Sequence, residues 1–350
     1  MTVQREESSR IDDTIAALST LAFQRTVDRS TVHRASISEV FITDGRKVSD
    51  SAYVVAAQVP PSHAYYRDQL LDRTVVDPTL LLECCRQAET YGGHLFQDIG
   101  PDEKFILRSW SMRLPGLLAA PSANRPAELA MTVRTRGRQL VGQRTGGLSY
   151  GIGMSIDGIA VGDVTIDVAY LSAETYTYLR NRGRRGAAPS SDDVAAVASN
   201  VIPARVGRRD PANVLLRDAV VDAGEAVATV RPAVDNPSTF DHPQDHVPGM
   251  VLTDAARQLC VLAGPRLTGA APERTTMAGF DLSFARYAEL DSPVEVRVHP
   301  GGDPDPVLAA ALPEVRAWQV SVHQHDAVIA GGVLFTTTLP QVEPRLAGAR

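Results

Sequence analysis

Lysine is nearly absent from this chain of 350 residues, and cysteine is scarce. Lys47 and Lys104 are the two lysines among 35 basic residues, and all the others are arginines. The cysteines, Cys84, Cys85 and Cys260, follow no metal-ligand spacing. We therefore expect them to be small apolar core residues in a reducing compartment. The arginine excess agrees with a GC-rich genome or with a demand for planar anion-binding groups.

Long apolar runs, a net positive charge and a basic leader are also missing. No apolar run approaches the roughly 18–20 residues that a membrane helix needs. The net charge of −6 gives no electrostatic footprint for nucleic acid or an anionic membrane. The polar start, MTVQREE, does not resemble a signal peptide, so we expect a cytoplasmic protein. The composition, 44% hydrophobic and 22% charged, is typical of globular proteins, and the length suggests two domains of roughly 150 residues each.

The chain contains an internal repeat. Residues 39–44 (EVFITD) resemble residues 213–218 (NVLLRD), and residues 82–88 (LECCRQA) resemble residues 253–259 (TDAARQL). These two landmarks occur in the same order in both halves, 44 and 41 residues apart. A repeat this long indicates two copies of one globular unit rather than a solenoid.

Composition suggests where the copies begin and end. We expect an N-terminal extension over 1–27, a first copy over 28–179, a linker over 180–209, a second copy over 210–340 and a tail over 341–350. The linker is rich in Arg, Gly, Pro and Ser, so we expect its arginines to form a solvated charge run.

The sequence pattern of each copy predicts one helix among strands. Asp77 and Pro78 are good helix-opening residues, and Gly92-Gly93 predicts the end of that helix. The second helix is predicted to open at Pro248-Gly249. Asp157-Gly158 predicts a hairpin turn. Strands are expected over 51–59, 104–110, 127–139, 148–156 and 159–171, and over 277–284, 294–298, 315–323 and 327–337. One helix wrapped by an antiparallel sheet is the hotdog plan, so we predict an α+β tandem, or double, hotdog.

Both predicted helices carry a polar triplet of the form acid-x-x-Arg-Gln. It is Glu83, Arg86 and Gln87 in the first copy, and Asp254, Arg257 and Gln258 in the second. The spacing puts each triplet on one helix face. An exposed intrahelical ion pair, worth about 0.3–0.5 kcal/mol, is the plain alternative. The recurrence of the triplet in an otherwise apolar helix favours a functional face.

The segment before the second helix, FDHPQDHVPGM over 240–250, is rich in His and Asp. Thiolates and zinc-site spacing are missing, so we predict no metal. A histidine before a helix and an acid inside it form a plausible acid–base pair, here His242 with Asp254. Free amides at the helix start could stabilise an oxyanion, and Gly249 would allow close approach of a ligand.

Two resemblances follow. Residues 248–255 (PGMVLTDA) are similar to the Pro-Gly-Val-Leu-x-x-Glu-Ala stretch of hotdog dehydratases that act on acyl-carrier-protein thioesters. A closer match, over about 31–340, is to the A-factor biosynthesis (AfsA) family of γ-butyrolactone synthases. The residues that carry it are 32–34 (VHR), 39–44 (EVFITD), His63 with Tyr65-Tyr66, Asp77-Pro78, 81–88 (LLECCRQA) and 241–250 (DHPQDHVPGM).

The second resemblance implies an acyltransferase of actinobacterial signalling with no metal and no cofactor. Such enzymes transfer a β-ketoacyl group from an acyl carrier protein to a hydroxyl of dihydroxyacetone phosphate. The ester closes to a phosphorylated butenolide on the way to a γ-butyrolactone or furan autoregulator. Asp254 stands where most members of the family carry Glu.

The resemblance also implies a role for each candidate residue. The predicted base is Glu83 or Asp254, assisted by His242, and the predicted phosphate ligand is Arg86 or Arg257. The other predicted substrate-binding residues are Gln87, Gln258, His63, His246 and Gly249. Backbone N–H groups near Gly249 or Thr79 would polarise the thioester carbonyl.

Two other functions remain open at this stage: a hotdog dehydratase or thioesterase, and a non-catalytic acyl- or lactone-binding protein. Acyl chain length, the number of active sites, and the choice between monomer and homodimer are also open.

Overall fold

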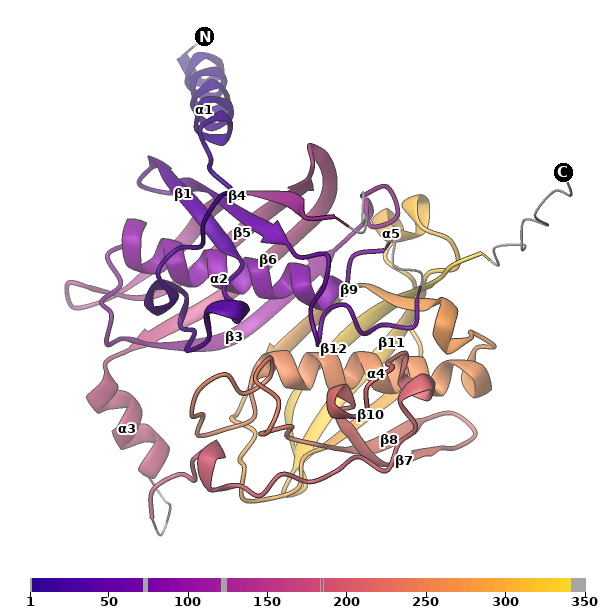
Figure 1. Cartoon of the computed structure of the whole chain (residues 1–350). Coiled ribbons are helices and arrows are strands. Elements are labelled where there is room, and N and C mark those ends of the chain that lie inside the picture. Colours follow the sequence, from indigo (N-terminus) through magenta and orange to yellow (C-terminus); the bar gives the residue numbers. More distant parts are fainter. Residues whose placement is uncertain (1, 72–74, 121–124, 183, 185, 341–350) are drawn as a thin grey trace, which may run out of the picture.

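The computed structural model describes residues 2–71, 75–120, 125–182, 184 and 186–340. All of its strands form one 12-stranded sheet, with two long helices packed across it (Figure 1). The strands are β1 Ile42–Ser49, β2 Ala52–Val59, β3 Lys104–Arg113, β4 Ala127–Val141, β5 Arg144–Ile156, β6 Ile159–Leu171, β7 Leu216–Val221, β8 Ala226–Val230, β9 Thr275–Phe284, β10 Glu295–Pro300, β11 Arg316–Gln324 and β12 Ala327–Thr338. The predicted α+β tandem hotdog is confirmed.

The sheet is built from two halves of the same strand order. The order is β1-β2-β4-β5-β6-β3 and then β9-β12-β11-β10-β8-β7, so the second half mirrors the first. The halves join where β3 pairs antiparallel with β9, in a register that places Trp110 opposite Leu282 and Arg113 opposite Gly279. This seam makes one continuous sheet from the two copies.

Each half wraps a central helix, α2 Pro78–Phe96 or α4 Gly249–Leu267. Asp77 caps α2 by accepting a hydrogen bond from the Thr79 backbone N–H at 2.9 Å, as predicted from its residue type. The predicted end at Gly92-Gly93 is wrong, because α2 continues to Phe96. A Cβ at Gly92 would lie 2.1 Å from the Tyr53 ring, so this glycine allows close packing instead of ending the helix.

The turn between β5 and β6 forms where it was predicted. Asp157 and Gly158 both adopt positive φ, at 47° and 82°, which is the conformation that a tight hairpin requires at its two central residues. The pair therefore sets the register of β5 against β6.

Shorter helices surround this body. They are α1 Thr2–Ser19, α3 Ala173–Asn181 and α5 Pro306–Ala311, with 3-10 helices at Arg29–Val32, Ile37–Glu39, Ser191–Asp193, Pro203–Val206, Pro211–Asn213 and Pro272–Arg274. In Figure 1, α1 stands out from the body near the N-terminus. None of the helices in the described residues has the length and hydropathy needed to cross a membrane.

The segment expected to be a solvated linker is packed against the second copy. Arg180 is 6% exposed and pairs with Asp245 at 2.9 Å and with Glu289 at 2.7 Å. Arg208 is fully buried. The solvated charge run is therefore wrong for these arginines, because carboxylates of the second copy pair with them. Since α3 runs through residue 180, the limits of the copies stay predictions, and the expected tail at 341–350 lies outside the described residues.

Candidate active site

Glu83 sits on α2 in a cage of hydrogen-bond donors. Its Oε1 accepts from Arg34 Nη2 at 2.6 Å, from Arg86 Nη2 at 2.8 Å and from Gln87 Nε2 at 2.7 Å. Its Oε2 accepts from Arg86 Nε at 2.9 Å. Burial alone would raise the pKa of Glu83, but the charges of Arg34 and Arg86 outweigh it and lower the pKa to about 2. Glu83 is therefore a permanent anion.

Asp254 on α4 has a matching cage. Its Oδ1 accepts from Arg257 Nε, and its Oδ2 accepts from Arg208 Nη2 at 2.9 Å, from Gln258 Nε2 at 3.0 Å and from the Tyr65 hydroxyl. Burial opposes ionisation, yet Arg257 and Arg208 hold the pKa of Asp254 well below its usual range. The same carboxylate–diarginine arrangement thus occurs in both copies.

Gln87 and Gln258 connect the helices to the chain outside them. Their side-chain oxygens accept the backbone N–H groups of Phe41 and Leu215, each at 2.9 Å. Their Nε2 groups donate to the helix acid and to the backbone carbonyl two residues before Phe41 or Leu215. Both N–H groups of each amide are therefore used within the fold. The two glutamines thus have no N–H group left for a substrate, and their substrate contact stays a prediction.

The hydrogen bonds around Glu83 and Asp254 bear on their predicted role as the catalytic base. A general base needs an oxygen within reach of the proton that it removes. Glu83 is 0% and Asp254 is 2% exposed, and every oxygen of both already accepts a hydrogen bond. The geometry thus suits them for holding arginines, and their role as the base stays a prediction.

The two cages differ in access. The side chain of Arg86 is 23% exposed, whereas that of Arg257 is 4% and that of Arg208 is 0% exposed. Of the two arginines predicted to bind phosphate, Arg86 is the one that a ligand can reach. Arg86 Nη1 makes no hydrogen bond with any residue that the structure describes.

Neutral imidazoles surround Arg86. Burial lowers the pKa of His33 to about 3, and the charge of Arg86 acts in the same direction. Its Nε2 lies 2.8 Å from His94 Nε2. Burial also lowers the pKa of His242, whose side chain is 37% exposed and whose Nε2 lies 2.6 Å from Gln244 Nε2. The predicted pairing of His242 with Asp254 does not form; His242 is instead coupled electrostatically to Arg86 and to Arg34 in the first-copy cage.

Three predicted positions are used elsewhere. His246 pairs with Asp245 at 2.6 Å beside α3, outside both cages. A Cβ at Gly249 would lie 2.8 Å from Leu107, so this glycine allows close packing, and its contact with a ligand stays a prediction. The backbone N–H of Thr79 donates to Asp77 and is not available to a thioester carbonyl.

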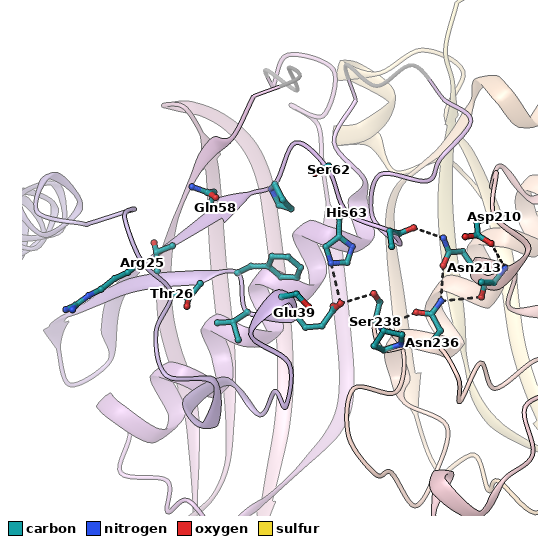
Figure 2. Close-up of a pocket in the computed structure, with 18 of the residues that line it drawn as sticks. Arg25, Thr26, Glu39, Gln58, Ser62, His63, Asp210, Asn213, Asn236 and Ser238 are labelled. Atoms are coloured by element: carbon teal, nitrogen blue, oxygen red, sulfur yellow. Dashed lines mark hydrogen bonds and ion pairs between the residues drawn. The ribbon is translucent and has the colours of Figure 1, made fainter.

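His63 lines a cavity of about 790 Å³ between the two copies (Figure 2). Glu39, Asn213, Asn236 and Ser238 also line it, so both copies contribute. His63 is thus a wall residue of this cavity, and its substrate contact stays a prediction. No cluster of three or more metal-ligating side chains occurs within the described residues, and the absence of a metal stays a prediction.

The sequence motifs gave no role to four residues that the structure brings to these sites, although Arg34, Glu39 and Tyr65 stand in the motifs that carry the family resemblance. They are Arg34, Arg208, Tyr65 and Glu39, and each makes a side-chain hydrogen bond at these sites. Arg34 precedes Glu39 by five residues, and Arg208 precedes Asn213 by five. The repeat therefore contained a signal for the two arginines, because it aligns Glu39 with Asn213.

The fold and the paired cages define the class of tandem hotdog proteins. Within it, the chain belongs to the family of the A-factor biosynthesis hotdog domain (AfsA), which matches residues 16–172 and 190–340. The predicted family membership is confirmed.

Individual relatives agree with this assignment. A 2-oxo-3-(phosphooxy)propyl 3-oxoalkanoate synthase from Streptomyces virginiae is 32% identical over 89% of this chain and 97% of its own. A protein of the same name from Streptomyces coelicolor is 30% identical over 89% of this chain and 90% of its own. Among solved structures, a trans-AT PKS dehydratase domain from Brevibacillus brevis aligns with a TM-score of 0.47 and 12% identity, over 83% of this chain and 94% of that one.

Proposed function

We propose that this protein is an acyltransferase that condenses a β-ketoacyl thioester with dihydroxyacetone phosphate. The name that its relatives carry describes the ester of a 3-oxo acid with a phosphorylated three-carbon ketone. Acyl carrier protein is the donor that we propose, and a phosphorylated β-keto ester is the first product, which closes to a butenolide. The observation that carries the proposal is the reachable guanidinium of Arg86, held in place by Glu83.

The corner around Arg86 suits a phosphate group. Glu83 and the Val32 carbonyl occupy Nε and Nη2 of Arg86, so the direction of the remaining nitrogen is set before a ligand arrives. Since burial keeps His33 and His242 neutral, they can donate to an anion or accept a proton without adding fixed charge. A preoriented arginine loses little conformational entropy when it binds a phosphate.

Product analysis tests the proposed reaction. The protein is incubated with β-ketoacyl carrier proteins of defined chain length, with and without dihydroxyacetone phosphate, and the products are followed by mass spectrometry. We expect a phosphorylated ester that requires both substrates. Acyl release that ignores the phosphate compound would indicate a thioesterase, and loss of water from a hydroxyacyl chain a dehydratase. No turnover, with acyl chain or lactone still bound, would indicate a binding protein. Each of these three results contradicts the proposal.

The variant Arg86→Met tests the phosphate contact. A charge-assisted hydrogen bond contributes about 1.5–3 kcal/mol. We therefore expect KM for dihydroxyacetone phosphate to rise at least about tenfold. Unphosphorylated dihydroxyacetone is the matched control, because its KM should not change. An equal effect on both acceptors would show that Arg86 does not recognise the phosphate.

A further inference from the structure

Glu39 lines the cavity between the copies and has a buried carboxylate oxygen that makes no hydrogen bond within the described residues. Glu39 is 3% exposed and ends the 3-10 helix Ile37–Glu39. Its Oε1 accepts a hydrogen bond from Ser238 Oγ at 3.0 Å, and His63 Nε2 lies 3.4 Å from the same oxygen. Its Oε2 is buried and has no partner within the part of the chain that the structure describes. A buried oxygen without a partner is costly, so its retention points to a ligand that supplies one.

His63 is held in the tautomer that supports Glu39. Its Nδ1 accepts the backbone N–H groups of Tyr65 at 3.2 Å and Tyr66 at 3.3 Å. The ring hydrogen is therefore on Nε2, the nitrogen that faces Glu39 (Figure 2). Ser238 donates to Oε1 of Glu39 and His63 Nε2 lies 3.4 Å from the same oxygen, which leaves Oε2 as the acceptor for a ligand.

The second copy has amides in the corresponding places. The repeat aligns Glu39 with Asn213, whose Oδ1 accepts from Asn236 Nδ2 at 2.8 Å. Asn213 Nδ2 donates in turn to the backbone carbonyl of Ala64 at 2.7 Å. An amide has no basic oxygen. Both copies therefore line the cavity. At this position of the repeat the first copy has a carboxylate, Glu39, and the second has an amide, Asn213.

We propose that Glu39 is the catalytic base that accepts the proton of the attacking hydroxyl. This inference rests on the proposed acyl transfer. The hydroxyl proton passes to Glu39 Oε2 as the alkoxide oxygen bonds to the thioester carbon. The C–S bond then breaks, and the proton passes from Glu39 to the departing thiolate. The products are the ester and a free thiol, so atoms and charge balance.

Gln87 links the segment that carries Glu39 to the Arg86 corner, although Arg86 itself is not among the residues that line the cavity. Gln87 Nε2 donates to the backbone carbonyl of Glu39 and to Glu83 Oε1, at 2.7 Å in each case. One amide group thus separates the segment that carries the base from the carboxylate that holds Arg86. The cavity, at about 790 Å³, lies within the range of roughly 300–1,000 Å³ usual for small-molecule sites.

The isosteric variant Glu39→Gln tests the role of the carboxylate. A glutamine oxygen can still accept from Ser238 and His63, so we expect the fold and the melting temperature to stay unchanged. We expect kcat to fall at least about 100-fold, as for the loss of a general base, while KM for dihydroxyacetone phosphate changes less than threefold. Glu89→Gln, which alters another buried glutamate outside the cavity, is the matched control and should keep kcat.

Chemical rescue separates catalysis from structure. Glu39→Ala should be inactive with the natural substrates and should regain at least tenfold in kcat when formate fills the vacated space. A folded Glu39→Gln with wild-type kcat, or a folded Glu39→Ala that formate does not rescue, would overturn the role of Glu39. If the wild type itself makes no phosphorylated ester, the proposed function fails and not this inference alone.

Discussion

The buried carboxylates of Glu83, Asp254 and Glu39 differ in how many of their oxygens accept a hydrogen bond. Glu83 and Asp254 accept hydrogen bonds on both oxygens and are each neutralised by two arginines. Glu39 keeps one oxygen without a partner among the described residues. Since proton transfer is favoured at an oxygen that holds no other donor, the environment decides which acid can act as a base and which ones hold cations.

The hydroxyl of Tyr65 gives a prediction at the residue scale. It donates to Asp254 inside the second cage, and Tyr65 is 3% exposed. Tyr65→Phe should lower the free energy of unfolding by about 2 kcal/mol, because a buried carboxylate loses one donor. Urea denaturation measures the change. Tyr178→Phe, at a residue that is 66% exposed, is the control and should stay within about 0.5 kcal/mol. Equal stability of Tyr65→Phe and wild type would contradict the prediction.

At the scale of the element, α2 carries a second acid that faces the sheet. Glu89 is 3% exposed and accepts from the Tyr170 hydroxyl at 3.2 Å and from Thr90 Oγ1 at 3.1 Å. Burial raises the pKa of Glu89 from 4.5 to about 7. Cys260 is the aligned position of α4, so this polar network belongs to the first copy.

The raised pKa of Glu89 predicts a pH dependence of stability. Between about pH 4.5 and pH 7 the folded protein keeps this proton and the unfolded chain loses it. Unfolding therefore releases a proton, and stability falls as the pH rises through this window and levels off above it. Glu89→Gln stays neutral, so its unfolding free energy relative to wild type should rise by about 2 kcal/mol from pH 5 to pH 8. Denaturant titrations at both pH values measure this difference, and parallel pH profiles would refute it.

At the scale of the whole molecule, polar side chains cross between the copies in addition to the β3–β9 seam. Arg208 donates to Asp254 at 2.9 Å and to the Tyr65 carbonyl at 2.7 Å, and it lies 3.6 Å from Asp77, the cap of α2. Asp241 accepts the backbone N–H of Ser36 from the other copy. The two halves thus share one hydrogen-bonded interior.

The removal of Arg208 should destabilise both halves together. Arg208→Met leaves Asp254 buried with one cation fewer, and breaking a buried pair costs about 3–5 kcal/mol. Guanidinium denaturation should show a loss of that size. Arg297→Met is the control: its side chain is 42% exposed and pairs with Glu295, so its loss should stay below about 1 kcal/mol. If Arg208→Met loses no more free energy of unfolding than Arg297→Met, Arg208 does not stabilise the contact between the copies.

Local pattern was sufficient for much of the fold. Asp77 and Pro78 begin α2 as their residue types predict, and Asp157-Gly158 forms the hairpin. These features depend on neighbouring residues, whose preferences are readable without the rest of the chain. The end of α2 was not predictable, because Gly92 is selected by contact with Tyr53, 39 positions earlier.

The sequence by itself determined the duplication, the helix acids with their arginines, and the family. Tertiary structure alone decided which of the acids accept hydrogen bonds on both carboxylate oxygens. Arg34 reaches Glu83 across 49 positions, Arg208 reaches Asp254 across 46, and Tyr65 reaches Asp254 across 189. Side chains this far apart in the sequence meet only when the chain folds, so the pattern of each helix by itself does not record these contacts. The environment of Glu39 also depends on how the copies pack, because His63 and Ser238, which contact its Oε1, come from different copies.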